Sequence, residues 1–201
     1  MQRTPPCLLA ALACTTCLTT GAGAENIMVR NLTDAAPGSL RAAVASANET
    51  PGPDVIRFKK RLRGTIKLTS GQIEITDQLR IAGPGASRLT VSGNNSSRIF
   101  QIGPTVKVSI KDLTISDGRN TSQENVPILV TRGGAILNDG GLLSLFRVTL
   151  CKNVTINEDS SDVVGGGAIV NSGFAVLAAT NCQFIDNIAS GGSRYAFGGA
   201  I

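Results

Sequence analysis

The sequence of 201 residues contains no histidine and no tryptophan, and only 3% of its residues are aromatic. The absence of histidine excludes every site that depends on an imidazole, the commonest general base and metal ligand. The chain also lacks the large side chains that usually fill a compact sandwich or an α/β enzyme. A core of thin, stacked aliphatic layers does not need them. The 23 glycines and the frequent Val, Ile and Leu residues fit such a core.

The N-terminal segment is predicted to be a secretory signal peptide. Arg3 supplies a positive start, an apolar stretch extends to Leu18, and Ala22-Gly23-Ala24 has the small residues of a cleavage site. The apolar stretch is too short, and too often interrupted by Thr, to span a bilayer. We therefore expect residues 1–24 to be removed and the mature protein to be secreted or displayed at the outer surface, with no membrane-spanning segment. A lipoprotein anchored through Cys14 is the alternative.

A motif of four residues, Gly-Gly-Ala-Ile, occurs three times at steps of 33 and 32 residues. Each of the first two copies is followed by one Asn shortly after the Ile and by a second Asn at the end of the unit. The landmarks are Gly133, Gly134, Asn138 and Asn153, then Gly166, Gly167, Asn171 and Asn187, then Gly198 and Gly199. Repeats of this length indicate stacked units, each of which buries its apolar face only against its neighbours.

The residues between these landmarks alternate between apolar and polar, as strands do. The sequence therefore predicts an all-β fold, a right-handed parallel β-helix or solenoid. Glycines are expected at its corners, where they allow positive φ, and asparagines are expected to stack as an amide ladder.

One segment departs from the β pattern. Residues 39–48 place Leu40, Ala43, Val44 and Ala47 on one face at helical spacing, with Ser39 as N-cap. We expect a short amphipathic helix that closes the first coil; docking of a partner is the alternative. The predicted organisation is a cap over residues 25–64 and β-helix coils over 65–201. Because the chain stops within a third motif, we expect further coils after Ile201 and an incomplete C-terminus.

Two stretches carry a family resemblance. Gly38-Ser39-Leu40-Arg41 and its surroundings, over residues 29–58, resemble the opening module of bacterial secreted and surface β-helix proteins. The Gly-Gly-Ala-Ile copies, together with Phe184-Ile185-Asp186-Asn187, resemble the repeats of polymorphic outer membrane proteins, which are autotransporter adhesins. The resemblance implies the fold, export and an adhesive surface. It departs from the family at Leu150, where a Phe is usual, and in the basic residues of 57–63.

The sharpest chemical feature is a basic run with five cations in the seven residues 57–63. It consists of Arg57, Lys59, Lys60, Arg61 and Arg63, with Lys67 nearby. Such a run is able to hold sulfate, carboxylate or phosphate groups of an acidic glycan on a host or neighbouring cell. The alternative is a solvated loop without a ligand. The net charge of +5 is too mild to indicate nucleic acid.

Carboxylates are sparse. Asp112 and Asp117 could begin a Ca²⁺-dependent lyase site, and Glu158, Asp159 and Asp162 lie in a Ser-rich segment. Nothing in the sequence specifies the fixed carboxylate separation that glycoside hydrolysis needs. We therefore expect no catalytic residue, no cofactor and no metal.

Cys151 and Cys182 remain after signal cleavage, and an exported protein can pair them. Aligning the units on Asn153 and Asn187 offsets the two sulfurs by three residues, which prevents a disulfide. Aligning on the cysteines stacks them and allows one.

The leading hypothesis is a non-catalytic, adhesin-like β-helix with a repetitive binding surface. A polysaccharide lyase or glycoside hydrolase on the same fold is one alternative, and a structural stalk for a downstream module is another.

Overall fold

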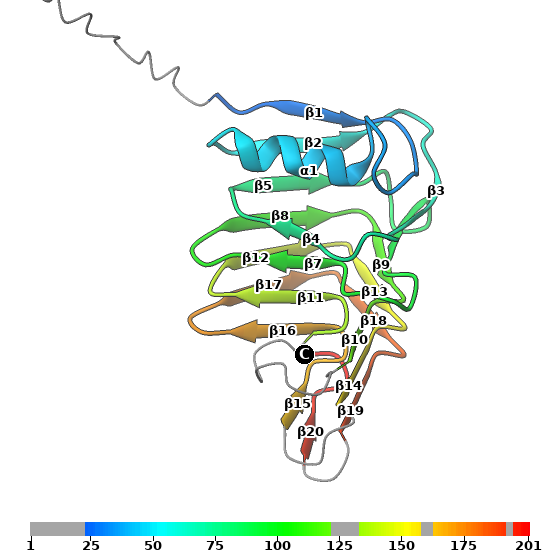
Figure 1. The fold of residues 1–201 in the computed structure, drawn as a ribbon, viewed down its shortest axis with the longest axis vertical. Helices are drawn as coiled ribbons and strands as arrows, with labels where there is room; N and C mark the ends of the chain where they lie inside the picture. Colours follow the sequence, from blue (N-terminus) through cyan, green and yellow to red (C-terminus); the bar gives the residue numbers. More distant parts are fainter. Residues whose placement is uncertain (1–22, 122–132, 158–162, 192–194) are drawn as a thin grey trace, which may run out of the picture.

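The computed structural model describes residues 23–121, 133–157, 163–191 and 195–201. These residues form a parallel β-solenoid of about four coils with one short helix near the N-terminus (Figure 1). A coil is one circuit of the chain around the long axis. Each strand hydrogen-bonds to strands of the neighbouring coils, at a spacing of about 4.8 Å. The predicted fold class, a parallel β-solenoid with an N-terminal helix, is confirmed.

The strands form five stacks, which we call sheets A to E. Sheet A contains β1 (Asn26–Val29), β2 (Asp54–Phe58), β5 (Leu79–Ala82), β8 (Lys107–Lys111), β12 (Leu142–Phe146) and β17 (Val176–Thr180). Sheet B contains β3 (Gly64–Lys67), β6 (Leu89–Ser92), β9 (Thr114–Ser116), β13 (Thr149–Cys151) and β18 (Gln183–Ile185). Sheet C contains β4 (Ile73–Ile75), β7 (Phe100–Ile102), β11 (Ile136–Asp139) and β16 (Ile169–Ser172). Sheet D contains β10 (Arg119–Thr121), β14 (Val154–Asn157) and β19 (Ile188–Gly191), and sheet E contains β15 (Val163–Gly165) and β20 (Tyr195–Phe197).

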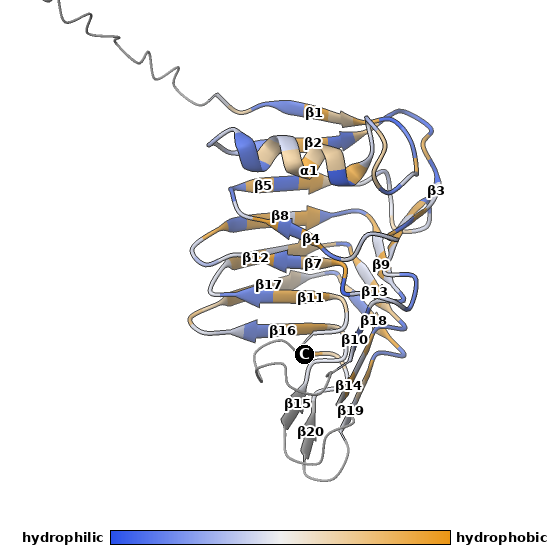
Figure 2. Cartoon of the chain, in the orientation of Figure 1, coloured by the Kyte–Doolittle hydropathy of each residue, from blue (hydrophilic) through white to orange (hydrophobic). Residues whose placement is uncertain are grey.

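The core is a set of stacked aliphatic columns. In sheet A, Ile56, Ile81, Ile110 and Leu145 lie in register on successive strands, and each is at most 1% exposed. Figure 2 shows the resulting alternation of hydrophobic and hydrophilic residues along the strands. Because side chains of a strand alternate between its two faces, the same register also aligns the outward residues in columns.

The three Gly-Gly-Ala-Ile motifs lie in register. The first glycine of each has a positive φ, and these are Gly133, Gly166 and Gly198. The second glycines stack so closely that a Cβ on Gly134 would lie 2.3 Å from the carbonyl oxygen of Gly167. A Cβ on Gly167 would likewise lie 2.2 Å from the oxygen of Gly199. Only glycine allows the coils to approach this far at that corner.

The asparagines stack in two side-chain ladders. Asn138 Nδ2 donates to Asn171 Oδ1 at 2.9 Å, and Asn153 Nδ2 donates to Asn187 Oδ1 at 2.9 Å. Asn153 Oδ1 also accepts the backbone N–H of Gly118 at 2.9 Å. Asn138, Asn153 and Asn187 also donate to the backbone carbonyls of Gly141, Ile115 and Leu150, and so satisfy polar groups at the bends of the chain.

Helix α1 (Leu40–Glu49) covers the N-terminal end of the core, as the sequence predicts. Ser39 Oγ accepts the N–H of Ala42 at 3.2 Å, and the four apolar residues of the predicted face are buried. Asn48 reaches the open edge of β4, where it donates to the carbonyl of Glu74 and accepts the N–H of Thr76, both at 2.9 Å. The helix therefore covers the apolar end and supplies partners to unpaired strand groups.

Asp34 and Arg41 bind further backbone groups at this end. Asp34 Oδ2 accepts the N–H groups of Thr69 and Ser70 at 2.9 and 2.8 Å, and Arg41 donates to Asp34 Oδ1 at 2.8 Å. Arg41 also donates to the carbonyls of Gly71 and Gln72. Burial acts to raise the pKa of Asp34, but the hydrogen bonds from Arg41, Thr69 and Ser70 outweigh it and lower the pKa to about 2.

The coils differ in length. The length of a coil is the number of residues between successive members of one outward column of sheet A. The column contains Val55, Arg80, Ser109, Ser144 and Ala178, so the successive coil lengths are 25, 29, 35 and 34 residues. The longer coils contain the strands of sheets D and E. The ladder of sheet A also begins earlier than expected, because β1 and β2 lie within the residues assigned to the cap.

Candidate functional site

The outer face of sheet A carries three columns of outward side chains. The first column contains Lys107, Leu142 and Val176. The second contains Asn26, Val55, Arg80, Ser109, Ser144 and Ala178. The third contains Met28, Arg57, Ala82, Lys111, Phe146 and Thr180.

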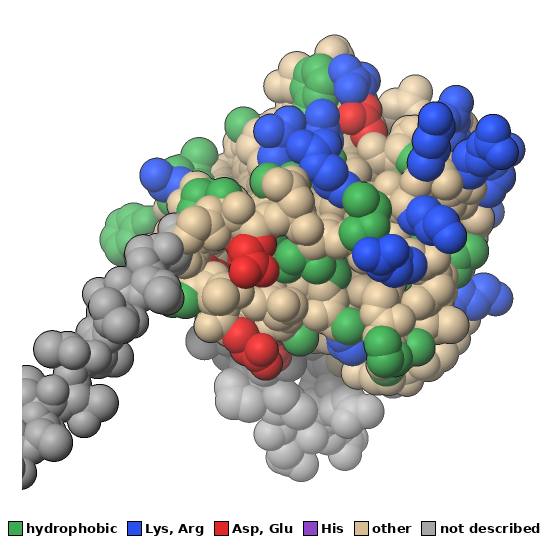
Figure 3. Space-filling view, turned by 90° about the horizontal axis from the view of Figure 1, so that it is seen from above, with side chains coloured by type: hydrophobic (Ala, Val, Ile, Leu, Met, Phe, Trp, Pro, Cys, Tyr) green, Lys and Arg blue, Asp and Glu red, His purple; other side chains and the backbone are tan. Residues whose placement is uncertain are grey.

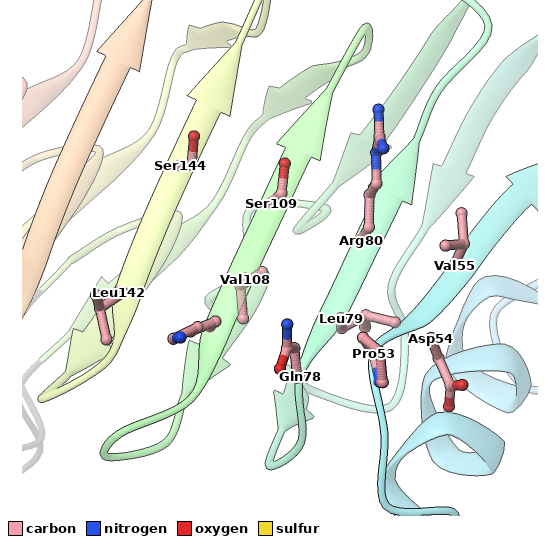
Figure 4. A pocket seen from close by; sticks show the side chains of 11 residues that line it. Pro53, Asp54, Val55, Gln78, Leu79, Arg80, Val108, Ser109, Leu142 and Ser144 are labelled. Atoms are coloured by element: carbon pink, nitrogen blue, oxygen red, sulfur yellow. The ribbon is translucent and has the colours of Figure 1, made fainter. Parts of the chain in front are cut away.

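The second column forms the floor of a shallow trough, because its later members are small. A hollow of about 510 Å³ lies over this region and is bordered by Gln78, Arg80, Lys107, Ser109 and Leu142, among others. Figure 4 shows Arg80, Ser109 and Ser144 pointing the same way from three neighbouring strands. The trough therefore crosses several coils, parallel to the solenoid axis.

The outer face of sheet A is cationic. Arg57, Arg80, Lys107 and Lys111 occupy outward positions, and no Asp or Glu stands in the three columns of described residues. The nearest strand carboxylate, Asp54, is only 1% exposed and accepts the N–H of Glu25 at 2.8 Å. Seen from the cap end, Lys and Arg side chains gather along one side of the molecule, where few Asp or Glu are visible (Figure 3).

The cations are staggered. Arg57 and Lys111 share the third column but stand two strands apart, about 9.6 Å along the axis, with Ala82 between them. Arg80 lies on the intermediate strand in the neighbouring column. Because like charges directly opposite each other destabilise a sheet, this arrangement limits repulsion and leaves gaps between the cations.

A second hollow, of about 370 Å³, lies at the end of the third column. Its lining contains the cations Arg57, Lys60 and Lys111, the apolar residues Met28, Phe58, Ala82 and Pro84, and Gly83. Three cations and several apolar residues therefore border one depression at the surface.

Beside this hollow, Arg147 forms a two-pronged ion pair with Asp112. Its Nε and Nη2 lie 2.6 and 2.9 Å from the carboxylate oxygens, while Lys111 Nζ is 3.7 Å away. The Arg147 guanidinium also stacks 4.3 Å from the centre of the Phe146 ring. The hydrogen bond from Arg147 lowers the pKa of Asp112 and raises the pKa of Arg147. Asp112 thus remains ionised and bound to its neighbours.

The structure divides the basic run of the sequence between two sheets. Arg57 stands on the outer face of sheet A, and Lys60 lines the second hollow. Lys59, Arg61 and Arg63 are exposed between β2 and β3, and Lys67 ends β3 in sheet B. Sequence reasoning missed Arg80, Lys107 and Lys111. Each lies on an alternating strand, but the unequal coil lengths hide their alignment with Arg57.

The carboxylates considered for catalysis have structural partners. Asp112 is in the ion pair with Arg147, and Asp117 Oδ2 accepts the hydroxyls of Ser92 and Ser116 at 3.0 and 2.6 Å. Glu158, Asp159 and Asp162 lie outside the described residues. Within the described ranges, no group of three or more His, Cys, Asp or Glu is placed to hold a metal ion.

A third hollow, of about 240 Å³, lies beside sheet C and contains Arg98. Arg98 is 6% exposed and donates to Gln72 Oε1 at 2.8 Å and to the Gly133 carbonyl at 3.0 Å. Burial lowers its pKa to about 10. The lining residues in the described part of the chain include no carboxylate.

Both thiols are free, so the possible disulfide between Cys151 and Cys182 is absent from the structure. Cys151 stands opposite Ile185, and Thr149 stands opposite Gln183, which places Cys182 opposite Val148. The two cysteines are therefore three residues out of register, as the sequence alignment on Asn153 and Asn187 predicts. Burial, followed by the negative charge of Asp117, raises the pKa of Cys151 and keeps it a thiol.

No protein-family model matches the chain, and no curated protein is significantly similar to it. In the described ranges, none of the helical structure is long and apolar enough to cross a membrane. The predicted signal peptide lies almost wholly outside the described residues, which begin at residue 23.

Proposed function

We propose that this protein is a non-catalytic, secreted or cell-surface solenoid that binds an acidic glycan along the outer face of sheet A. The observation that carries the proposal is the charge of this face: four cations and no carboxylate in its three columns. Arg57, Arg80 and Lys107 have no carboxylate within 4 Å among the described residues, so their charges remain available to a ligand.

The shape of the face favours an extended chain as the ligand. The trough crosses strands that repeat every 4.8 Å or so, and its floor of Ser109, Ser144 and Ala178 leaves room between bulkier flanks. Serine hydroxyls are able to bond sugar hydroxyls, and the cations meet acidic groups at several points. Many weak contacts along one ligand add up to useful affinity without a deep pocket.

The resemblance of the Gly-Gly-Ala-Ile and Phe-x-x-Asn repeats to polymorphic outer membrane proteins supports an adhesin-like protein at a bacterial surface. The N-terminal sequence, with its apolar stretch and small residues before Glu25, supports export. The partner is then an acidic glycan of a host or neighbouring cell.

The test compares binding of the mature chain to three polysaccharides: heparin, which is sulfated, alginate, which carries carboxylates, and dextran, which is neutral. We expect binding to the two acidic polymers only, with an affinity that falls as salt rises. A variant with Arg57, Arg80, Lys107 and Lys111 changed to Gln should lose at least tenfold in affinity.

The matched control changes four exposed cations elsewhere, Lys59, Arg61, Arg63 and Lys67, to Gln, so that net charge falls equally. This control should bind nearly as well as the unaltered chain. Equal losses in both variants would show that net charge alone drives binding. Depolymerisation of either acidic polymer would contradict the non-catalytic proposal, and tighter binding of single-stranded DNA would contradict a glycan ligand.

A further inference from the structure

The second hollow brings three cations together on the described surface of the solenoid. Arg57 on β2 and Lys60 just after β2 belong to one stretch of the chain, whereas Lys111 comes from the end of β8. No run of sequence would bring Lys111 to the other two. The fold creates this cluster through the alignment of Arg57, Ala82 and Lys111 in one column.

Ala82 creates the space between the cations. It occupies the strand between those of Arg57 and Lys111, and its methyl group leaves the depression open where a longer side chain would fill it. The backbone that follows is bound to the next coil, because the Gly83 N–H donates to the Lys111 carbonyl at 2.8 Å. The two coils lie so close that a Cβ on Gly83 would be 2.2 Å from the carbonyl oxygen of Asp112. The floor of the hollow is therefore a fixed part of the stack.

The hollow keeps an excess of positive charge. Asp112 is the carboxylate nearest to Lys111, at 3.7 Å, but it is already bound at shorter distances by Arg147. Arg57 has only a 3.3 Å contact to the amide oxygen of Asn26. Among the described residues, Asp112 is the only carboxylate within 4 Å of Arg57, Lys60, Lys111 or Arg147, and a bound anion would replace water around several of these cations.

The lining of the hollow is partly apolar. Met28 is 39% exposed and stands beside Arg57 in the third column, and Phe58 and Pro84 also line the hollow. Apolar lining contributes nothing to the binding of a free inorganic ion, whereas the carbon face of a sugar ring packs against it. The site therefore fits a ligand that carries a compact anionic group next to an apolar surface.

We propose that this hollow is a subsite for one tetrahedral oxyanion ester, a sulfate or a phosphate, carried on a sugar ring. Arg57 and Lys60 approach from the end of β2 and Lys111 from β8, which suits an anion with oxygens in several directions better than a planar carboxylate. This inference rests on the proposed function, because the hollow lies at one end of the glycan-binding face. The inference specifies the chemical class of the group that binds in the hollow.

The test titrates four monosaccharides into the mature chain and follows the backbone amide signals of Ala82, Gly83 and Gly85 by NMR. The probes are N-acetylglucosamine, its 6-sulfate, its 6-phosphate and glucuronate. We expect saturable shifts with the two esters, at least tenfold weaker binding of glucuronate and none of the neutral sugar. The ratio of sulfate to phosphate affinity identifies which ester the site prefers.

Ala82→Phe fills the hollow without removing a cation and should weaken ester binding at least tenfold. Gln183→Phe places the same aromatic ring at an exposed position of β18 in sheet B and should leave ester binding unchanged. Arg57→Gln serves as an independent second variant, with the same expected loss as Ala82→Phe. Thermal melts confirm that each variant is folded.

Ester binding that survives both Ala82→Phe and Arg57→Gln would overturn the subsite, as would equal binding of glucuronate. A separate result would contradict the proposed function: the unaltered chain would bind neither heparin nor alginate. If Ala82→Phe loses the esters but keeps alginate, both proposals hold and the subsite is separate from the trough.

Discussion

The first coils and the last coils hold the same kind of core by different means. Around β2 to β9 the coils are short, the Gly-Gly-Ala-Ile motif is absent, and helix α1 closes the end. From β11 onward the coils are longer and glycine doublets form one corner. Asparagine side chains there hydrogen-bond to each other between the bends of neighbouring coils. The inward side chains of the first coils are buried, whereas inward side chains of the last coil, such as Leu177 and Phe184, are partly exposed.

One inward column shows this difference directly. Leu143 on β12 is 2% exposed, whereas Leu177, its partner on β17, is only half-buried. The same holds for Leu150, which is fully buried, and Phe184, which is partly buried. A coil is protected only when both of its faces are covered. At the N-terminal end, the helix supplies the cover that a neighbouring coil supplies elsewhere.

The largest expected effect comes from removing a buried side chain within this column. Leu143→Ala should lower the free energy of unfolding by about 3 kcal/mol, since it leaves a cavity between two coils. Leu177→Ala, the matched change in the half-covered coil, should cost roughly half as much. Urea denaturation of both variants measures the difference, and equal losses would show that the last coil is as well packed as the others.

The next effect concerns the cap. The pKa of Asp34 in the folded protein is about 2, below its ordinary value of 3.8. The stability that the ionised carboxylate gives the folded state is therefore fully present above pH 3.8 and is lost as pH falls toward 2. Asp34→Asn should therefore lower stability by about 2 kcal/mol at pH 7 and weaken the dependence on pH between 4 and 2. Denaturation at several pH values tests this. If the free energy of unfolding of Asp34→Asn changes with pH below 4 as steeply as that of the unaltered chain, Asp34 contributes little to stability.

A somewhat smaller effect is expected in the ladder of the longer coils. Asn153→Ala leaves the buried N–H of Gly118 without its partner, at a cost of about 1.5 kcal/mol. Asn187→Ala, at the less buried end of the same ladder, should cost less. Hydrogen exchange at Gly118 reports the loss directly. Retained protection there in Asn153→Ala would mean that another group replaces the amide.

The smallest effect concerns the ion pair that joins a short coil to a long one. Arg147→Gln removes the pair with Asp112, but Arg147 is exposed, so the loss of stability should be slight and should vanish at high salt. It should also shift the pKa of Asp112 upward, toward its ordinary value, which NMR titration of the carboxylate measures. A large, salt-independent destabilisation would instead identify the pair as a principal tie between the two regions.

Much of the fold was predictable because it rests on local or repeated signals. The helix has a cap residue and an apolar face within ten residues, and the structure places it at Leu40–Glu49. The glycine doublets repeat at nearly constant steps, so their stacking follows from spacing alone. The basic run was also evident from the sequence, but not which of its residues would line one hollow. In the structure Arg57 and Lys60 line the second hollow together with Lys111, which lies far from them in the sequence.

The sequence by itself determined the alternation of apolar and polar residues, the corner glycines and the stacking asparagines, and these specify a solenoid. Only the tertiary structure decided which outward side chains stand next to one another. The reason is that each coil has its own length, 25, 29, 35 and then 34 residues along sheet A. The position of Lys111 two strands from Arg57, with Ala82 between them, depends on the sum of the first two of these lengths, which no local pattern encodes.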